Sequence, residues 1–229
     1  MSADDREPGE SGAEPTGDST PARTAATRSG QQWAGSAVVI LAGGRSTRFG
    51  AAEKTAARLG DRSVLDWVLD GVPDRVPLVV AGPRRPSPRE GVVWVREEPA
   101  GGGPVAGLAA ALALLAPGVD CVIVLAGDQP FGMRAAPRLL AALRAAGKAA
   151  AVGTDPEGRP QPLLAAYRLD ALRSAIGPAP FGRAMRQVLA GLDVVGVPVT
   201  HREALDVDTP EDLRRAEALL LSDLEESAP

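Results

Sequence analysis

The sequence predicts an α/β domain built on a mostly parallel sheet. Short apolar segments rich in valine alternate along the chain with segments whose apolar residues repeat at helical spacing. This alternation is typical of folds in which a helix connects each strand to the next parallel one. The length of 229 residues and the apolar fraction of 45% suit one such domain with a well-buried core.

The strands are predicted from unbroken apolar runs. Residues 37–42 are apolar throughout, which is the pattern of a strand covered on both faces. The other predicted strands are residues 78–81, 92–95, 121–125 and 194–197, and residues 163–167 are a further candidate. Right-handed crossovers would place the strand-to-helix loops at the carboxyl edge of the sheet, where such folds bind ligands.

The helices are predicted from apolar spacing and from end signals. Predicted helices cover residues 64–70, 105–115 and 181–190, and a last one starts near Pro210. Ser63 is a suitable N-cap for the first of them. Pro210 suits a first helical turn, and Glu211 and Asp212 are favoured beside the positive end of the helix dipole.

Both ends of the chain are expected to be solvated tails around a domain of residues 36–221. Residues 1–35 are rich in small, polar and charged residues and cannot bury enough surface to offset their ordering entropy, so we expect disorder. Residues 222–229 carry three acids and no base. Each end has a net charge of -3, so within the total of -4 the body of the chain is mildly positive, which suits an anionic ligand.

Composition argues against several classes of function. Aromatic residues make up only 3% of the chain, so few side chains could stack on bases and no nucleic-acid partner is expected. The single cysteine, Cys121, cannot form an internal disulfide and fits a reducing compartment. Apolar runs stay below about 18 residues and the N-terminus has no hydrophobic signal core, so we expect no membrane and a cytoplasmic location.

The loop after the first strand has features of a phosphate-binding site. Gly43 and Gly44 allow the backbone to approach a ligand closely. Arg45, Arg48 and Lys54 follow nearby, and Lys54 is informative because the chain uses 23 arginines but only two lysines. The spacing matches neither the P-loop nor the GxGxxG fingerprint. A solvated loop with chance positive charge is the alternative interpretation.

A carboxylate that could hold magnesium follows the strand at 121–125. Asp128 lies in the motif Gly127-Asp-Gln-Pro130, just past the carboxyl end of that strand. Magnesium takes one or two carboxylates and completes its octahedron with water and phosphate oxygens. The alternative interpretation is that Asp128 only shapes a turn before the proline.

A second candidate for the metal lies near the end of the chain. Asp206 and Asp208 flank Val207, so in an extended segment both point to the same side. A second carboxylate at the rim is what metal-assisted nucleotidyl transfer would use. Alternatively, Thr209 or Asp208 is simply the N-cap of the last helix.

Four motifs occur in one order along residues 37–220. They are Leu41-Ala-Gly-Gly44 with Arg48-Phe-Gly50 and Lys54, then Gly103-Pro-Val-Ala-Gly107, Gly127-Asp-Gln-Pro130 and Asp208-Thr-Pro-Glu211. The set resembles the nucleotidyltransferases that act on sugar phosphates and cofactors, and most closely the MobA-type molybdenum cofactor guanylyltransferases. The resemblance implies a single Rossmann-like three-layer domain of the nucleotide-diphospho-sugar-transferase type.

The resemblance also implies a reaction. It implies transfer of GMP from GTP to the terminal phosphate of molybdopterin, with release of pyrophosphate, in molybdenum cofactor biosynthesis. The implied cofactor is Mg²⁺. The implied partners are GTP and molybdopterin, and molybdoenzymes or other cofactor-maturation proteins are further candidates.

The same resemblance assigns roles to residues. Arg48, Lys54 and Asp128 would be catalytic, with Arg48 and Lys54 stabilising charge on the phosphates. The expected nucleotide-binding residues are Leu41, Ala42, Gly43, Gly44, Lys54, Ala81, Glu98, Gly103 and Asp128. The expected metal ligands are Asp128 and Asp208, with Asp206 as the alternative second ligand. Candidates for the pterin side are Gln161 with the loop 158–162, Arg183 and Arg186, for which ordinary surface charge is the alternative.

Departures from the family pattern leave open which nucleotide base the protein binds. Ala81 stands where the family tends to have asparagine, and Glu98 where it has aspartate; Asp206 and Asp208 replace asparagines. Ala-Gly-Gly in the first loop favours GTP. A cytidylyltransferase of the same fold, acting on molybdopterin or a polyol phosphate, is the second hypothesis, and a catalytically silent nucleotide-binding regulator is the third.

Overall fold

The computed structural model describes residues 31–43 and 54–226. The chain divides into two units, Met1–Gln31 and Gln32–Pro229, and the second is described here. Residues 44–53, most of the expected N-terminal tail and the side chain of Lys54 lie outside the described part. Within that part, no helix is both long and apolar enough to cross a membrane.

A seven-stranded sheet forms the centre of the domain, in the order β5-β4-β1-β6-β8-β7-β9. Its strands are β1 (Ser36–Leu41), β4 (Leu78–Ala81), β5 (Val93–Val95), β6 (Cys121–Ala126), β7 (Ala150–Thr154), β8 (Pro160–Arg168) and β9 (Val194–Pro198). Neighbouring strands pair in parallel except at β8, which is antiparallel to β6 and β7. The prediction of an α/β fold with a mostly parallel sheet is confirmed. A small antiparallel pair, β2 (Arg58–Leu59) and β3 (Arg62–Ser63), lies outside this sheet.

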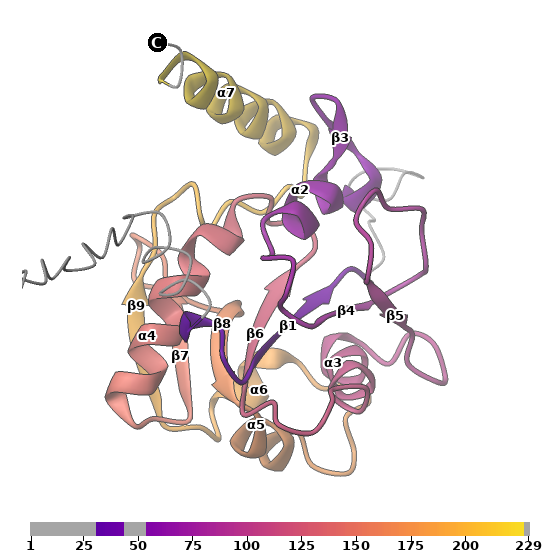
Figure 1. Cartoon of the computed structure of the whole chain (residues 1–229), viewed down its shortest axis with the longest axis vertical. Helices are drawn as coiled ribbons and strands as arrows, with labels where there is room; N and C mark the ends of the chain where they lie inside the picture. The colour runs from indigo at the N-terminus through magenta and orange to yellow at the C-terminus, as the bar shows by residue number, and fades with distance from the viewer. Residues whose placement is uncertain (1–30, 44–53, 227–229) are drawn as a thin grey trace, which may run out of the picture. The chain divides into compact units, whose positions relative to one another are not determined.

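Helices cover both faces of the large sheet, so the domain has three layers (Figure 1). One face carries α2 (Val64–Asp70) and α4 (Ala136–Ala146), and the other carries α3 (Pro104–Leu112), α5 (Leu169–Ile176) and α6 (Met185–Leu189). Further helices are the short η1 (Lys54–Ala56) and η2 (Gly132–Ala135) and the C-terminal α7 (Pro210–Glu226).

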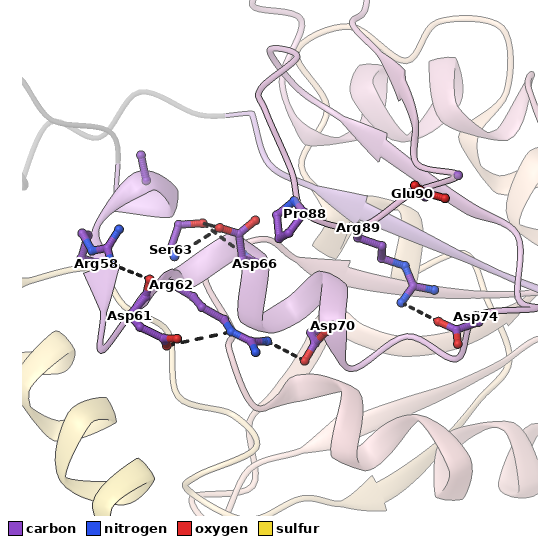
Figure 2. Close-up of a pocket in the computed structure, with 12 residues that line it drawn as sticks. Arg58, Asp61, Arg62, Ser63, Asp66, Asp70, Asp74, Pro88, Arg89 and Glu90 are labelled. Atoms are coloured by element: carbon purple, nitrogen blue, oxygen red, sulfur yellow. Dashed lines mark hydrogen bonds and ion pairs between the residues drawn. The ribbon is translucent and has the colours of Figure 1, made fainter.

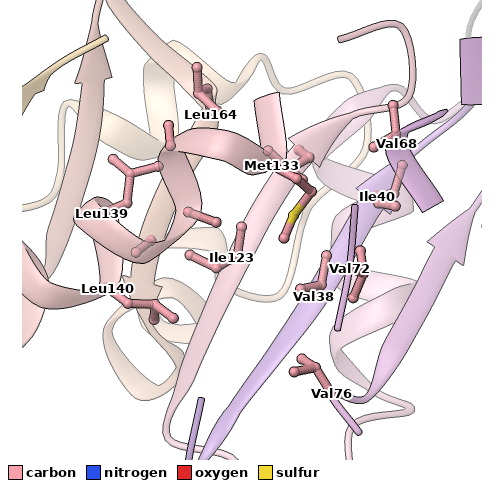
Figure 3. Close-up of a cluster of buried hydrophobic side chains, with 14 of the residues drawn as sticks. Val38, Ile40, Val68, Val72, Val76, Ile123, Met133, Leu139, Leu140 and Leu164 are labelled. Atoms are coloured by element: carbon pink, nitrogen blue, oxygen red, sulfur yellow. The ribbon is translucent and has the colours of Figure 1, made fainter. Parts of the chain in front are cut away.

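The central strands are buried on both sides. Every residue of β1 and β6 is buried, and successive side chains of a strand point to opposite faces. Val38, Ile40 and Ile123 join the cluster that contains the α2 and α4 side chains (Figure 3). Val39 and Leu41 join the cluster under α3 and α5. The unbroken apolar run of β1 is therefore explained by the two helical layers.

Some elements differ from their predicted bounds. The end of α3 tightens, because Leu114 and Leu115 donate to carbonyls three residues back, as in a 3₁₀ turn. Residues 181–184 are not helical, since Gly182 has a φ of +70° and the helix begins only after Ala184. The sequence analysis did not predict α4, β7 or α5; β7 contains two alanines and a glycine and is a strand because β8 and β9 pair with it.

Two helices begin with the same capping arrangement. Ser63 Oγ accepts from the backbone N–H of Asp66 at 3.1 Å, and the Asp66 carboxylate accepts from the Ser63 N–H at 3.3 Å. At α7 the corresponding pair is Thr209 and Asp212, with distances of 3.2 and 3.0 Å. The Ser63 cap is confirmed, and the cap of the last helix is Thr209 rather than Asp208.

The domain extends past the expected bounds of 36–221 at both ends. Trp33 packs against the first core cluster, so the chain is already part of the domain before β1. At the other end α7 continues to Glu226. The carboxylate of Asp223 there accepts hydrogen bonds from Arg134 and Arg202, both at 2.6 Å. Residues 222–226, expected in an acidic tail, are therefore part of α7, and Asp223 among them is paired with two arginines.

Replacing the N-cap Ser63→Ala should lower the free energy of unfolding by about 1 kcal/mol, because the Asp66 N–H loses its acceptor. Urea unfolding measures the change. Ser222→Ala is the matched control, since its hydroxyl bonds only to the Ala218 carbonyl of its own helix. Equal losses in the two variants would contradict a capping role.

Asp223→Asn tests the charge pairing through pH. Hydrogen bonds from Arg202 and Arg134 lower the pKa of Asp223 from 3.8 to about 2. A carboxyl whose pKa falls on folding stabilises the protein above its unfolded pKa and loses that contribution as pH falls through its folded pKa. At neutral pH the free energy of unfolding of the wild type should exceed that of the variant by about 1 kcal/mol. That gap should close as urea titrations move from pH 3.8 to about pH 2; a gap independent of pH would argue against the pairing.

Candidate functional site

The candidate site lies where the strand order reverses. From β1 the chain continues to β4 and β5 on one side, whereas β6 and the later strands lie on the other. Loops that leave the carboxyl ends of two such strands diverge and open a crevice, which is where open α/β sheets bind ligands. Leu41 and Ala126, the last residues of β1 and β6, are direct partners in the sheet. The expected residues Leu41, Ala42 and Asp128 are thereby brought to one place.

Ala42 is held between two neighbouring turns by backbone contacts. Its N–H donates to the Ala81 carbonyl at 2.8 Å, and the Gly127 N–H donates to the Leu41 carbonyl at 2.9 Å. A Cβ at Gly82 would lie 2.9 Å from the Ala42 carbonyl carbon, and one at Gly127 would lie 3.0 Å from the Ala42 Cβ. Sequence analysis missed Gly82, although a glycine directly after a buried strand is a signal for close backbone approach.

Part of the expected phosphate-binding loop cannot be placed. Gly43 is described, and a Cβ added there would make only ordinary contacts, the nearest at 3.7 Å. Gly44 and Arg48 lie outside the described residues, and Lys54 is described only as the first backbone position of η1. The roles assigned to these three residues stay predictions.

Asp128 is joined to the Asp206–Asp208 segment. Asp128 is only 7% exposed. Its backbone carbonyl accepts a hydrogen bond from the Val207 N–H at 2.9 Å. Val207 is fully buried, whereas Asp206 and Asp208 on either side of it are partly exposed. Partly exposed and buried residues therefore alternate in this segment, as expected. One hydrogen bond connects the segment to the Asp128 turn.

These carboxylates suit magnesium better than a metal that needs a protein cage. Among residues 31–43 and 54–226, no group of three or more His, Cys, Asp and Glu side chains could hold a metal ion. Magnesium needs only one or two carboxylates beside water and phosphate oxygens. Asp128 with Asp208 or Asp206 would provide that number, and these ligand roles stay predictions. The cap of α7 is Thr209, so capping does not occupy Asp208.

The residues expected at the base, Ala81 and Glu98, have different surroundings. The Ala81 side chain faces α3, because a Cβ at Gly107 would lie 3.5 Å from it. Glu98 is exposed. Its neighbour Glu97 is the carboxylate that accepts from the Gly101 N–H, at 2.9 Å, and that lies beside Gly107. Sequence analysis assigned Glu98 from the family pattern and did not consider Glu97, and a contact of Glu98 with the base stays a prediction.

The Gly101–Gly103 turn leads directly into α3. Gly103 precedes the helix with a φ of +88°, a conformation that favours glycine. The Phe181 ring covers Gly102, since a Cβ there would lie 2.5 Å from the ring, and the Gly182 N–H donates to the Gly102 carbonyl at 2.8 Å. The turn is therefore supported from outside by the chain before α6.

The two arginines proposed for the pterin side have different surroundings. The Arg183 guanidinium donates to the carbonyls of Ala175 and Ile176, at the end of α5. The guanidinium therefore has structural partners at this end of α5, and a contact of Arg183 with the pterin stays a prediction. Arg186 is exposed on α6.

A pocket of about 1010 Å³ adjoins the Asp206–Asp208 segment. Its lining includes Asp155, Arg159, Gln161, His201, Asp206 and Asp208. These residues come from the ends of β7 and β9, the start of β8 and the segment before α7. Gln161, expected on the acceptor side, is thus brought into one pocket with the second carboxylate pair. Asp155 was not expected.

Another pocket, of about 1080 Å³, contains none of the expected site residues (Figure 2). It lies between α2 and residues 88–91. Two ion pairs lie within its lining: Arg62 donates to Asp70 at 2.8 Å, and Arg89 lies 3.5 Å from Asp74.

Comparison with known proteins identifies the family of the chain. The family model of the MobA-like NTP transferase domain matches residues 38–195. The molybdenum cofactor guanylyltransferase of Cereibacter sphaeroides is 32% identical over 193 residues, which cover 81% of this chain and 97% of that protein.

Solved structures show the same fold. Molybdopterin-guanine dinucleotide biosynthesis protein A from Archaeoglobus fulgidus matches with a TM-score of 0.64 and 26% identity, over 81% of this chain and 98% of that one. The 2-C-methyl-D-erythritol 4-phosphate cytidylyltransferase of Thermus thermophilus matches with a TM-score of 0.62 at 24% identity, over 80% and 97%. At that identity the second match concerns the fold alone. The chain is a nucleotidyltransferase and belongs to the MobA-like NTP transferase family.

Proposed function

We propose that this protein transfers GMP from GTP to the terminal phosphate of molybdopterin, with Mg²⁺, and releases pyrophosphate. The observation that carries the proposal is the hydrogen bond from the Val207 N–H to the Asp128 carbonyl, which joins the segment of Asp206 and Asp208 to the turn that follows β6. The name of the Cereibacter sphaeroides relative supports molybdenum cofactor and guanylyl transfer as the chemistry.

The reaction proposed is an in-line displacement at the α-phosphorus of GTP. An oxygen of the acceptor's terminal phosphate forms the new bond, and the bond to the bridging oxygen of pyrophosphate breaks. Mg²⁺ held by Asp128 and Asp208 would neutralise developing charge on the phosphates. Arg48 and Lys54 are proposed to stabilise the same charge, and the backbone at Leu41 to Gly43 to lie against the guanosine.

An acidic residue beside the Gly101–Gly103 turn supports guanine as the base. Guanine presents two adjacent N–H donor groups, and a carboxylate is an acceptor with room for several hydrogen bonds. Glu97 already accepts from Gly101, and it retains capacity for further donors. We propose that the carboxylate of Glu97 or Glu98 accepts hydrogen bonds from these N–H groups of guanine.

The central experiment incubates the full chain with radiolabelled nucleoside triphosphates, Mg²⁺ and molybdopterin. A GMP adduct should form from GTP, and Asp128→Asn should lower turnover by about a hundredfold or more while the protein stays folded. Asp74→Asn is the control, because its side chain is 99% exposed. A CMP adduct instead would make the enzyme a cytidylyltransferase. Tight GTP binding without pyrophosphate release for any acceptor would favour the silent regulator.

The close approach at Ala42 can be tested separately. Gly82→Ala would place a Cβ 2.9 Å from the Ala42 backbone, so that backbone must shift where we propose that it meets GTP. We expect the KM for GTP to rise about tenfold, which corresponds to about 1.4 kcal/mol. Gly191→Ala is the matched control, since its nearest contact is an ordinary 3.6 Å. Equal kinetics for the two variants would show that the approach does not matter.

A further inference from the structure

A buried carboxylate organises one wall of the pocket beside Asp206 and Asp208. The Asp155 side chain is 4% exposed. It accepts three hydrogen bonds: from the Arg159 N–H at 2.8 Å, from Arg159 Nε at 2.8 Å and from Gln161 Nε2 at 3.0 Å. Burial by itself would raise the pKa of Asp155, but these bonds hold it below its ordinary value. The ionised form is therefore the one that orients its neighbours.

These bonds orient the two side chains that Asp155 holds. Because the Gln161 amide nitrogen donates to Asp155, its oxygen remains as an acceptor; the flipped amide would place that oxygen against the carboxylate. The Arg159 guanidinium is 70% exposed and also donates to Glu157 at 2.9 Å. The wall thus offers one oriented acceptor next to a cationic donor.

Two of the arginines that line this pocket are already paired with carboxylates of the protein. Arg159 is paired with Asp155 and Glu157, and Arg202 with Asp223. Such a lining favours a neutral polar ring with both donors and acceptors over a second triphosphate, which would need unmatched cations.

We infer that this pocket is the acceptor subsite, and that Gln161 and Arg159, positioned by Asp155, bind the polar edge of a pterin ring. The inference rests on the proposed function and names the residues that would select its acceptor. A pterin carries amino and ring N–H donors beside carbonyl and ring-nitrogen acceptors, which match Gln161 Oε1 and Arg159. The acceptor phosphate would then lie toward Asp206 and Asp208, which the Val207 hydrogen bond joins to Asp128.

The test compares Gln161→Leu and Asp155→Asn with wild type in the full chain. We expect the KM for molybdopterin to rise about tenfold in each, with the KM for GTP within about twofold. The Kd of the fluorescent probe 6-hydroxymethylpterin should rise in parallel without any nucleotide present. Asp193→Asn is the matched control, because its carboxylate is also bonded to a cation, Lys148 at 2.7 Å, but at the amino end of β9.

The outcomes separate this inference from the proposed function. Unchanged values for molybdopterin and the pterin probe in both variants would overturn the inference while GMP transfer stands. An equal loss of GTP affinity would also overturn it, because the pocket would then belong to the nucleotide. If wild type bound no nucleoside triphosphate, the proposed function and the inference would both fail. Gln161→Leu keeps the test valid if Asp155→Asn is unstable, since it leaves the ion pair of Asp155 with Arg159 in place.

Discussion

The hydrogen bond from the Val207 N–H to the Asp128 carbonyl joins two parts of the chain that are far apart in sequence. It holds because Val207 is fully buried in a small cluster with Leu59, Val64 and Phe131, so the backbone at this point has no water to bond. The turn after β6 and the segment before α7 are therefore one unit. Both proposed metal-binding carboxylates depend on it.

The C-terminal helix strengthens this unit from outside. Asp223 on α7 bonds to Arg134 and Arg202, and both guanidinium groups also lie over the Phe131 ring, at 5.7 and 4.6 Å from its centre. Phe131 lies three residues after Asp128. Helix α7 is thus connected to the chain that follows Asp128 through ion pairing and aromatic contact.

The direction of β8 decides how the pocket near Gln161 is built. In a sheet of parallel strands only carboxyl ends reach the ligand-binding edge. Because β8 runs antiparallel, its amino end lies at that edge, between the carboxyl ends of β6 and β7. Gln161 near the start of β8 therefore lies next to Asp155, which follows β7. A wholly parallel sheet would have put these two residues at opposite edges.

Local signals in the sequence were enough for much of the fold. The apolar run of β1, the cap at Ser63 and the order of the four motifs determined the fold class, the start of α2 and the family, because each depends on neighbours along the chain or on a motif. Only the tertiary structure decided that Ala81 turns toward α3, that Glu97 rather than Glu98 contacts the Gly101 turn, and that Asp155 holds Gln161. These outcomes depend on which strands and helices pack together, and local periodicity carries no information about such partners.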